Sequence, residues 1–292
     1  GMPVVFSYAG ISVQLEPPAS SDVDAPESTD TTGYDLWFRA SAACCKGLDM
    51  WGGLRDARVL ELGCGLGGVG IWCLKRGAKS AVLSDSNLIV CRAASRNIDD
   101  SGLHQRCRVV HSGFADVAST VPRTSESWVT AVADEKPLPS HPASVEHQAP
   151  PSVSGCLSSK CSGDAMWEHW YPDVIIAADV CFTDRVAREL AEGLVSVLQR
   201  WPEARVVIGH QERRAVFRDG EGEIRTEAHD SALAELIAAC STKGCHLGIV
   251  RLEEDLVAIT RGTLGDTTVV TNDRNEGAAS DSNAKRAKFE AE

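Results

Sequence analysis

A short apolar run leads directly into three closely spaced glycines: Val59-Leu-Glu-Leu-Gly-Cys-Gly-Leu-Gly67. The run predicts a buried strand, and the segment from Gly67 to Arg76 predicts a helix that ends at Gly77. Glycines between the two let the backbone approach a ligand closely, and the helix N-terminus offers unpaired N–H groups. A chain with this strand, loop and helix is expected to build an α/β sheet around a ligand site.

The alternation continues on both sides of this loop. Strands and helices that follow one another in this way form βαβ units and a parallel sheet. We therefore predict a Rossmann-like α/β fold with a seven-stranded, mostly parallel sheet, helices on both faces and a C-terminal antiparallel strand pair. The further strands are predicted at Ser80–Leu83, Arg106–His111, Asp173–Ala178, Arg205–Ile208, His246–Arg251 and Asp255–Thr260, and the further helices at Asn87–Ser101, Asp184–Arg200 and Ser231–Lys243.

The remaining segments divide the chain into parts. Residues 1–32 predict a hairpin of Val4–Tyr8 and Ile11–Leu15 followed by a Pro- and Ser-rich loop, and Tyr34–Leu48 predicts a helix before the main fold. The main domain covers residues 33–262, with residues 116–171 predicted as a disordered insertion because they carry no sustained period. Residues 263–292 predict a polar tail.

Charge and cysteine content narrow the environment and the partners. A net charge of −12 disfavours a nucleic-acid substrate, which needs clustered Lys and Arg, and suits a basic protein partner. Eleven cysteines without a CxxC pair indicate free thiols in a reducing compartment, with no metal site expected. No apolar run reaches the roughly 20 residues of a membrane span. We expect a monomeric cytoplasmic protein. The basic cluster near Lys285 makes an additional nuclear location the alternative.

Two carboxylates, Asp85 and Glu61, bear on which cofactor the loop binds, and Glu61 distinguishes between the candidates. The spacing Gly63-x-Gly65-x-x-Gly68 also fits a dinucleotide-binding loop, and Asp85 at the end of the next strand could hold the ribose of either cofactor. Glu61 lies two positions before the first glycine, where its negative charge would repel a pyrophosphate and attract the amino group and sulfonium of S-adenosylmethionine. The sequence therefore favours S-adenosylmethionine, with an NAD-dependent oxidoreductase as the rival.

At this point the chain resembles methyltransferase family 16, the seven-β-strand protein lysine methyltransferases. The similarity covers roughly residues 33–115 and 172–262 and rests on four motifs. These are Thr32-Gly33-Tyr-Asp-Leu-Trp37, Leu60-Glu-Leu-Gly-Cys-Gly-Leu-Gly67, Leu83-Ser-Asp85 with Asn87, and Ala177-Ala-Asp179-Val-Cys-Phe182.

The resemblance implies roles for individual residues. Trp37 would pack on the cofactor, Asp85 would hold its ribose, and Ala178 would supply a backbone contact. Phe114 stands where the family carries the Trp that covers the adenine, and Trp128, Trp167 or Trp170 could substitute for it. The other residues of the expected cofactor site are Glu61, Gly63, Cys64, Gly65, Gly67 and Asn87.

Asp179 and Phe182 match the family's acidic and aromatic element at the mouth of the substrate channel. A carboxylate beside an aromatic wall can orient a lysine amine while the ring contacts the lysine stem, whereas a structural alternative is that Asp179 caps the next helix. The expected activity is methyl transfer from S-adenosylmethionine to a lysine of a protein substrate. A nicotinamide-like small-molecule amine is the alternative substrate, and an inactive scaffold is disfavoured because Glu61, Asp85 and Asp179 are all present.

Overall fold

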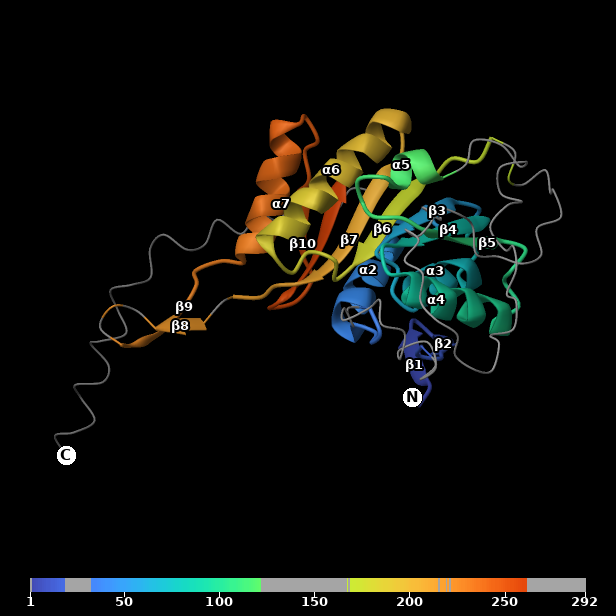
Figure 1. The fold of residues 1–292 in the computed structure, drawn as a ribbon, viewed down its shortest axis with the longest axis horizontal. Helices are drawn as coiled ribbons and strands as arrows, with labels where there is room; N and C mark the ends of the chain where they lie inside the picture. The colour runs from blue at the N-terminus through green and yellow to red at the C-terminus, as the bar shows by residue number, and fades with distance from the viewer. Residues whose placement is uncertain are drawn as a thin grey trace, which may run out of the picture.

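The computed structural model describes residues 2–18, 33–121, 167, 169–214, 216–218, 220 and 222–261. Its centre is a seven-stranded sheet with the order β10-β11-β7-β6-β3-β4-β5 (Figure 1). The pairs from β5 to β7 are parallel, and β11 and β10 run antiparallel at one edge. This confirms the predicted fold class. The strands are β3 Arg58–Leu62, β4 Ser80–Asp85, β5 Cys107–His111, β6 Val174–Ala178, β7 Arg205–Gln211, β10 Gly248–Arg251 and β11 Leu256–Arg261.

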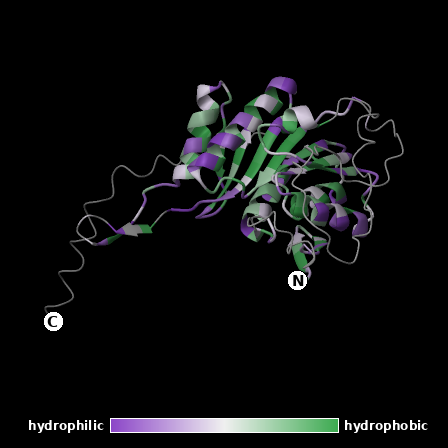
Figure 2. Cartoon of the chain, in the orientation of Figure 1, coloured by the Kyte–Doolittle hydropathy of each residue, from purple (hydrophilic) through white to green (hydrophobic). Residues whose placement is uncertain are grey.

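Helices cover both faces of the sheet (Figure 1). One face carries α2 Phe38–Trp51, α3 Gly68–Lys75 and α4 Leu88–Asp100, and the other carries α5 Val117–Thr120, α6 Asp184–Arg200 and α7 Ser231–Thr242. Figure 2 shows the apolar strands enclosed between helices whose hydrophilic residues lie largely on the outside. Because side chains alternate along a strand, Leu60 and Leu62 join one core and Val59 the other. Glu61 thus lies buried on the same face as α3.

Helix α2 crosses β7 at very short range. A Cβ atom on Gly209 would overlap the carbonyl oxygen of Ala40, so only glycine fits there. The close approach sets Trp37, the N-cap residue of α2, at the carboxyl ends of the strands. The predicted helix at Tyr34–Leu48 is therefore confirmed, but it begins at Phe38 and extends to Trp51.

The N-terminal hairpin is confirmed as β1 Val4–Tyr8 and β2 Ile11–Leu15. We predicted it as a part separate from the main domain, yet its inward side chains belong to the domain core. Phe6, Val13 and Leu15 are buried beside Trp72 of α3, whose indole N–H donates to the Tyr8 carbonyl oxygen at 3.2 Å. A hairpin as short as Val4–Leu15 cannot enclose its own apolar face, so it shares the core of the sheet.

The predicted disordered insertion at residues 116–171 is wrong at both ends. Val117 and Val121 are buried in the core beside α6, and so are Trp167 and Trp170. Trp170 donates its indole N–H to the hydroxyl of Ser80 at 2.9 Å, which ties this end to the start of β4. The four-residue helix α5 and the single side chains of Trp167 and Trp170 are too short to show a periodic pattern in the sequence. Residues 122–166 and 168, like the predicted loop at 19–32 and the tail at 263–292, lie outside the described residues.

The hairpin before α7 was not predicted, and neither was α5. A second hairpin, β8 Val216–Arg218 paired with β9 Ile224–Thr226, projects from the body of the protein between β7 and α7 (Figure 1). The nine cysteines among the described residues are buried and free, as expected for thiols. None of the described helices is long and apolar enough to cross a membrane.

Candidate functional site

A cavity of about 570 Å³ opens where the parallel strands end. Its volume lies in the range of small-molecule and cofactor sites. Every site residue predicted from the sequence lines it, except Gly67. The predicted residues that the structure brings together are Trp37, Glu61, Gly63, Cys64, Gly65, Asp85, Asn87, Phe114, Ala178, Asp179 and Phe182.

The loop after β3 requires glycine at three positions. Gly63, Gly65 and Gly67 have φ angles of 64°, 51° and 84°, which side chains with a Cβ rarely adopt. A Cβ on Gly63 would also lie 2.5 Å from a methyl group of Val180. Gly67 differs from the other two because it is the N-cap of α3 and packs toward Leu83. Gly67 shapes the turn into α3 and does not line the cavity, and its expected contact with the cofactor stays a prediction.

Glu61 is almost completely buried beside the first turn of α3. Its Oε2 accepts the backbone N–H of Gly70 at 3.0 Å, and a Cβ at Gly70 would lie 2.5 Å from that oxygen. Burial raises the pKa of Glu61 from 4.5 to about 8, the Gly70 N–H opposes this shift, and the charge of Asp85 adds to it. A carboxyl group thus occupies the helix N-terminus that a pyrophosphate would need in a dinucleotide-binding protein.

Asp85 and Asn87 hold the turn after β4. Asp85 accepts the N–H of Gly65 at 3.0 Å through Oδ2 and the N–H of Asn87 at 2.9 Å through Oδ1. Asn87 is the N-cap of α4 and accepts the N–H groups of Ile89 and Val90. Asp85 therefore joins the glycine loop to the β4 turn at the rim of the cavity. The thiol of Cys64 in the glycine loop is buried, and burial raises its pKa well above the ordinary value.

Asp179 directly follows β6 in an unusual conformation. Its φ is 60°, in the left-handed region, and its side chain is only 2% exposed. The helix that follows is capped by Thr183, whose Oγ1 accepts the N–H of Val186 at 3.2 Å. The alternative that Asp179 caps α6 is therefore wrong. Strained backbone that borders a cavity is frequently functional, and this observation supports a role for the Asp179 side chain in the site.

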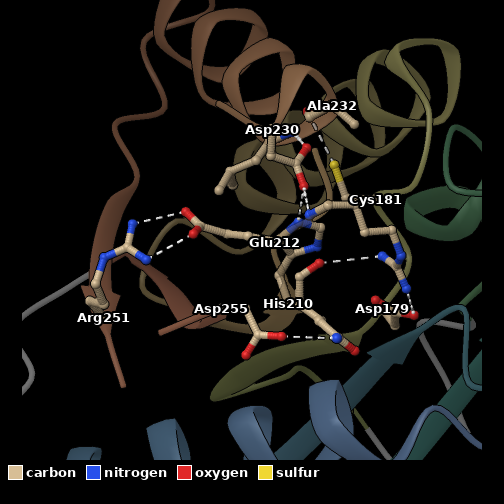
Figure 3. A network of polar contacts seen from close by, with 11 residues as sticks. Asp179, Cys181, His210, Glu212, Asp230, Ala232, Arg251 and Asp255 are labelled. Carbon is tan, nitrogen blue, oxygen red and sulfur yellow. Dashed lines mark hydrogen bonds and ion pairs between the residues drawn. The ribbon is translucent and has the colours of Figure 1, made fainter. Parts of the chain in front are cut away.

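No sequence pattern pointed to the partner of Asp179. Arg213, which follows β7, donates from Nη2 to Asp179 Oδ2 in a part-buried ion pair. The backbone N–H of Arg213 donates to Asp230 Oδ2 at 2.6 Å, and Asp230 also accepts from His210 Nε2 at 3.0 Å. Figure 3 shows Asp230 and His210 in this network, with Asp179 at its edge. The network lies beside the cavity wall. It was not predicted because Arg213 and Asp230 lie 34 or more residues after Asp179 and neither is next to a motif.

Aromatic side chains border the cavity on three sides. Trp37 is 52% exposed and Phe182 is 43% exposed, so both stand at the mouth, whereas Phe114 packs partly buried against the core. Trp167 and Trp170 are buried in the core, and neither lines the cavity. Among the described residues Phe114 is thus the better candidate for an adenine contact, and Trp128 lies outside them.

Comparison with known families matched part of the chain. Residues 45–131 match the family model described as Conserved hypothetical protein 95, a segment that contains the glycine loop, Asp85 and Phe114. This model is not that of methyltransferase family 16, so the narrower resemblance stays a proposal. No curated protein matched significantly.

Comparison with solved structures found matches at low identity. A SAM-dependent methyltransferase from Aquifex aeolicus is 14% identical, with 74% of this chain and 87% of that chain covered and a TM-score of 0.43. The ribosomal protein L11 methylase from Lactobacillus delbrueckii subsp. bulgaricus is 13% identical, with 76% and 78% covered and a TM-score of 0.41. Precorrin 8W decarboxylase from Methanobacterium thermoautotrophicum is 10% identical, with 75% and 89% covered and a TM-score of 0.37.

The sheet itself decides the fold class. Five parallel strands, with the crossover point between β3 and β6 and an antiparallel pair β10-β11 at one edge, form the mixed seven-stranded Rossmann-like sheet. Ligands of open α/β sheets bind at the carboxyl ends of the strands beside such a crossover, where this cavity lies. The chain therefore has a mixed seven-stranded Rossmann-like fold, with its cavity at the position where such sheets bind ligands.

Proposed function

We propose that this protein is an S-adenosylmethionine-dependent methyltransferase that acts on a lysine of a protein substrate. The observation that carries the proposal is the acidic character of the cavity next to the glycine loop. Glu61 and Asp85 border it, with Asp35 from the segment before α2. Arg185 is the basic residue among those that line it, and it is paired with Glu189 at 2.9 Å. Such a site suits a ligand with an amino group and a sulfonium, and disfavours a pyrophosphate.

The chain's own residues fit the parts of this cofactor. Glu61 faces the amino-acid part, Asp85 the ribose, and Phe114 the adenine, around a glycine loop that leaves room for close approach. When bound, S-adenosylmethionine supplies an activated methyl group. The protein aligns an amine with that group and keeps water out.

Support for a protein substrate comes from the mouth of the cavity. Trp37 and Phe182 are about half exposed there, so a long side chain entering from solvent would pass between aromatic surfaces. The same residues with Asp179 carry the resemblance to methyltransferase family 16. A basic partner also suits the net charge of −12. We propose that the protein works as a monomer in the cytoplasm, with a nuclear pool as the alternative.

Calorimetry with S-adenosylhomocysteine and with NAD tests the cofactor. We expect binding of the former alone, and a loss of roughly 1.5–3 kcal/mol in D85A because charge-assisted hydrogen bonds to the ribose disappear. D85A should also bind 5′-methylthioadenosine, which keeps the ribose and lacks the amino-acid part, more weakly by the same factor. The surface variant D99A is the control. Undiminished affinity in D85A would remove the ribose contact, and binding of NAD alone would replace the proposal with a dehydrogenase.

Mass spectrometry of a cell extract incubated with the protein and methyl-labelled cofactor tests the substrate. Label on protein lysines supports the proposal. Label confined to small amines would favour a small-molecule methyltransferase instead.

A further inference from the structure

The two oxygens of the Asp179 carboxylate have different surroundings. Oδ2 accepts from Arg213, whereas Oδ1 is buried and has no hydrogen-bond partner among the described residues. Asp179 borders the cavity between Ala178 and Val180. A buried acceptor without a donor costs free energy of about 1–3 kcal/mol, so its retention at a cavity wall indicates a donor supplied by a ligand.

Arg213 is fixed in place from several sides. Its backbone N–H is held by Asp230, which is itself held by His210 and by the N–H of Leu233 at 2.9 Å. Its guanidinium carbon lies 5.4 Å from the centroid of the Trp37 ring. The hydrogen bond that Arg213 donates to Asp179 raises the pKa of Arg213, so the guanidinium keeps its charge.

Two further titratable groups lie near the pair. Asp230 and Cys181 face Arg213 from the segments before α7 and after β6, and the charge of Asp230 adds to the rise in the pKa of Arg213. Burial raises the pKa of the Cys181 thiol to about 12, so it stays neutral, and Asp230 accepts from His210 Nε2 and from the Arg213 backbone N–H. The other titratable side chains that line the cavity are Asp35, Glu61, Cys64, Asp85, Arg185 and Glu189.

We propose that Arg213 is a positioning residue that turns Asp179 into a charge-neutral acceptor for an uncharged amine. The inference rests on the proposed methyltransferase function and deepens it. An isolated carboxylate would stabilise an ammonium ion and raise its pKa above the ordinary lysine value of ~10.4, leaving no lone pair for attack. An Asp–Arg pair removes that bias, while Oδ1 still accepts one N–H and orients the nitrogen.

The transfer step then balances. The amine nitrogen keeps one N–H on Asp179 Oδ1 and uses its lone pair to form a bond to the methyl carbon. The carbon–sulfur bond breaks and its electron pair stays on sulfur, which becomes a neutral thioether. The methylated nitrogen is now an ammonium ion, and it loses a proton to water.

The pH dependence of methyl transfer to poly-L-lysine tests the inference. R213M leaves a lone carboxylate, so the apparent pKa of the rate should rise by at least about one unit, with a loss of at least about tenfold near pH 7.5 and recovery at high pH. The double variant D179N/R213M carries an uncharged amide acceptor and should move the profile back toward the wild-type position. R188M, which breaks the surface pair with Glu235 between α6 and α7, is the matched control and should leave the profile unchanged.

Affinity for S-adenosylhomocysteine separates this inference from the proposed function. It should stay within about twofold of wild type in R213M. An unshifted pH profile in R213M, or additive losses in the double variant, would overturn the role of Arg213. If R213M does not fold, R213K decides, with a smaller shift in the same direction expected and no shift contradicting the role. Wild-type protein that binds S-adenosylhomocysteine but leaves poly-L-lysine unmethylated also overturns it, whereas failure to bind overturns the proposed function.

Discussion

Two walls of the cavity come from different stretches of chain, and they are held in different ways. The loop at Gly63–Gly67 is fixed mainly by near neighbours in sequence: Gly67 N–H donates to Cys64, and Asp85 reaches Gly65 from the next strand. Asp179 on the other wall is fixed by the Gly209 carbonyl and by Arg213, which come from β7 and the segment after it. The first wall is a local structure, and the second exists only once the sheet has formed.

The difference predicts different consequences of mutation. A change in the loop should damage cofactor binding and folding together, because the same backbone serves both. A change at Asp179 should act on the substrate while leaving the cofactor in place, because its contacts come from the other half of the sheet.

The largest effect is expected for G63A. The substitution places a Cβ at a φ of 64° and 2.5 Å from Val180. Backbone strain and overpacking together should cost about 2–5 kcal/mol of stability. Chemical denaturation measures the stability, and calorimetry should find no binding of S-adenosylhomocysteine. G220A, between β8 and β9 and outside the cavity lining, is the matched control, because a Cβ there meets nothing within 4 Å. Wild-type affinity in G63A would show that the loop does not need this geometry.

D179N is the corresponding test of the second wall. Asparagine tolerates the left-handed conformation and keeps the shape, but it leaves the charge of Arg213 unmatched. We expect turnover to fall on the order of 10²-fold, the scale of lost alignment, with cofactor affinity nearly unchanged. D49N, which weakens the surface pair with Arg76, is the control. Parallel loss of cofactor affinity would mean that the two walls are not independent, and full activity would remove Asp179 from the mechanism.

The same contrast explains what could be predicted from sequence. Strands, helices and the glycine loop follow from short-range patterns, so the elements of the sheet and the position of the loop were predictable from apolar period and glycine spacing. Asp179 and Phe182 were placed at the cavity by their position after a strand. Gly67 was grouped with the other loop glycines because spacing alone does not distinguish a glycine that lines a ligand site from one that shapes a helix start.

Arg213 and the buried tryptophans required the fold. Arg213 lies between a strand and a hairpin in a stretch rich in charges, and nothing local distinguishes it from its neighbour Arg214. Trp167 and Trp170 contribute single side chains to a core built by distant elements. Their role depends on tertiary packing, which leaves no period in the sequence.

Substitution of Glu61 should give the smallest effect. It is also the sharpest test of whether the wall at the glycine loop binds the cofactor. Its pKa of about 8 lies above the ordinary 4.5, so the folded protein binds the proton more tightly than the unfolded chain. Glu61 therefore contributes stability that is fully present below pH 4.5 and is lost as the pH rises through 8. E61Q keeps an acceptor for the Gly70 N–H and cannot ionise, so in the absence of cofactor it should melt higher than wild type above pH 8.

The cofactor should reverse this preference. A bound cationic amino group favours ionised Glu61, so wild-type protein at pH 7 should release roughly nine-tenths of a proton on binding S-adenosylhomocysteine, as expected for a group with a pKa of about 8. Calorimetry in two buffers of different ionisation enthalpy counts that proton. E61Q should release none and bind roughly tenfold more weakly, the scale of one charge-assisted hydrogen bond less the cost of ionisation. Its affinity for 5′-methylthioadenosine, which has no amino group, should be unchanged. Equal losses of affinity for the two ligands would mean that Glu61 supports the loop and does not face the cationic amino group. The wall at the glycine loop would then act on the cofactor through its structure alone.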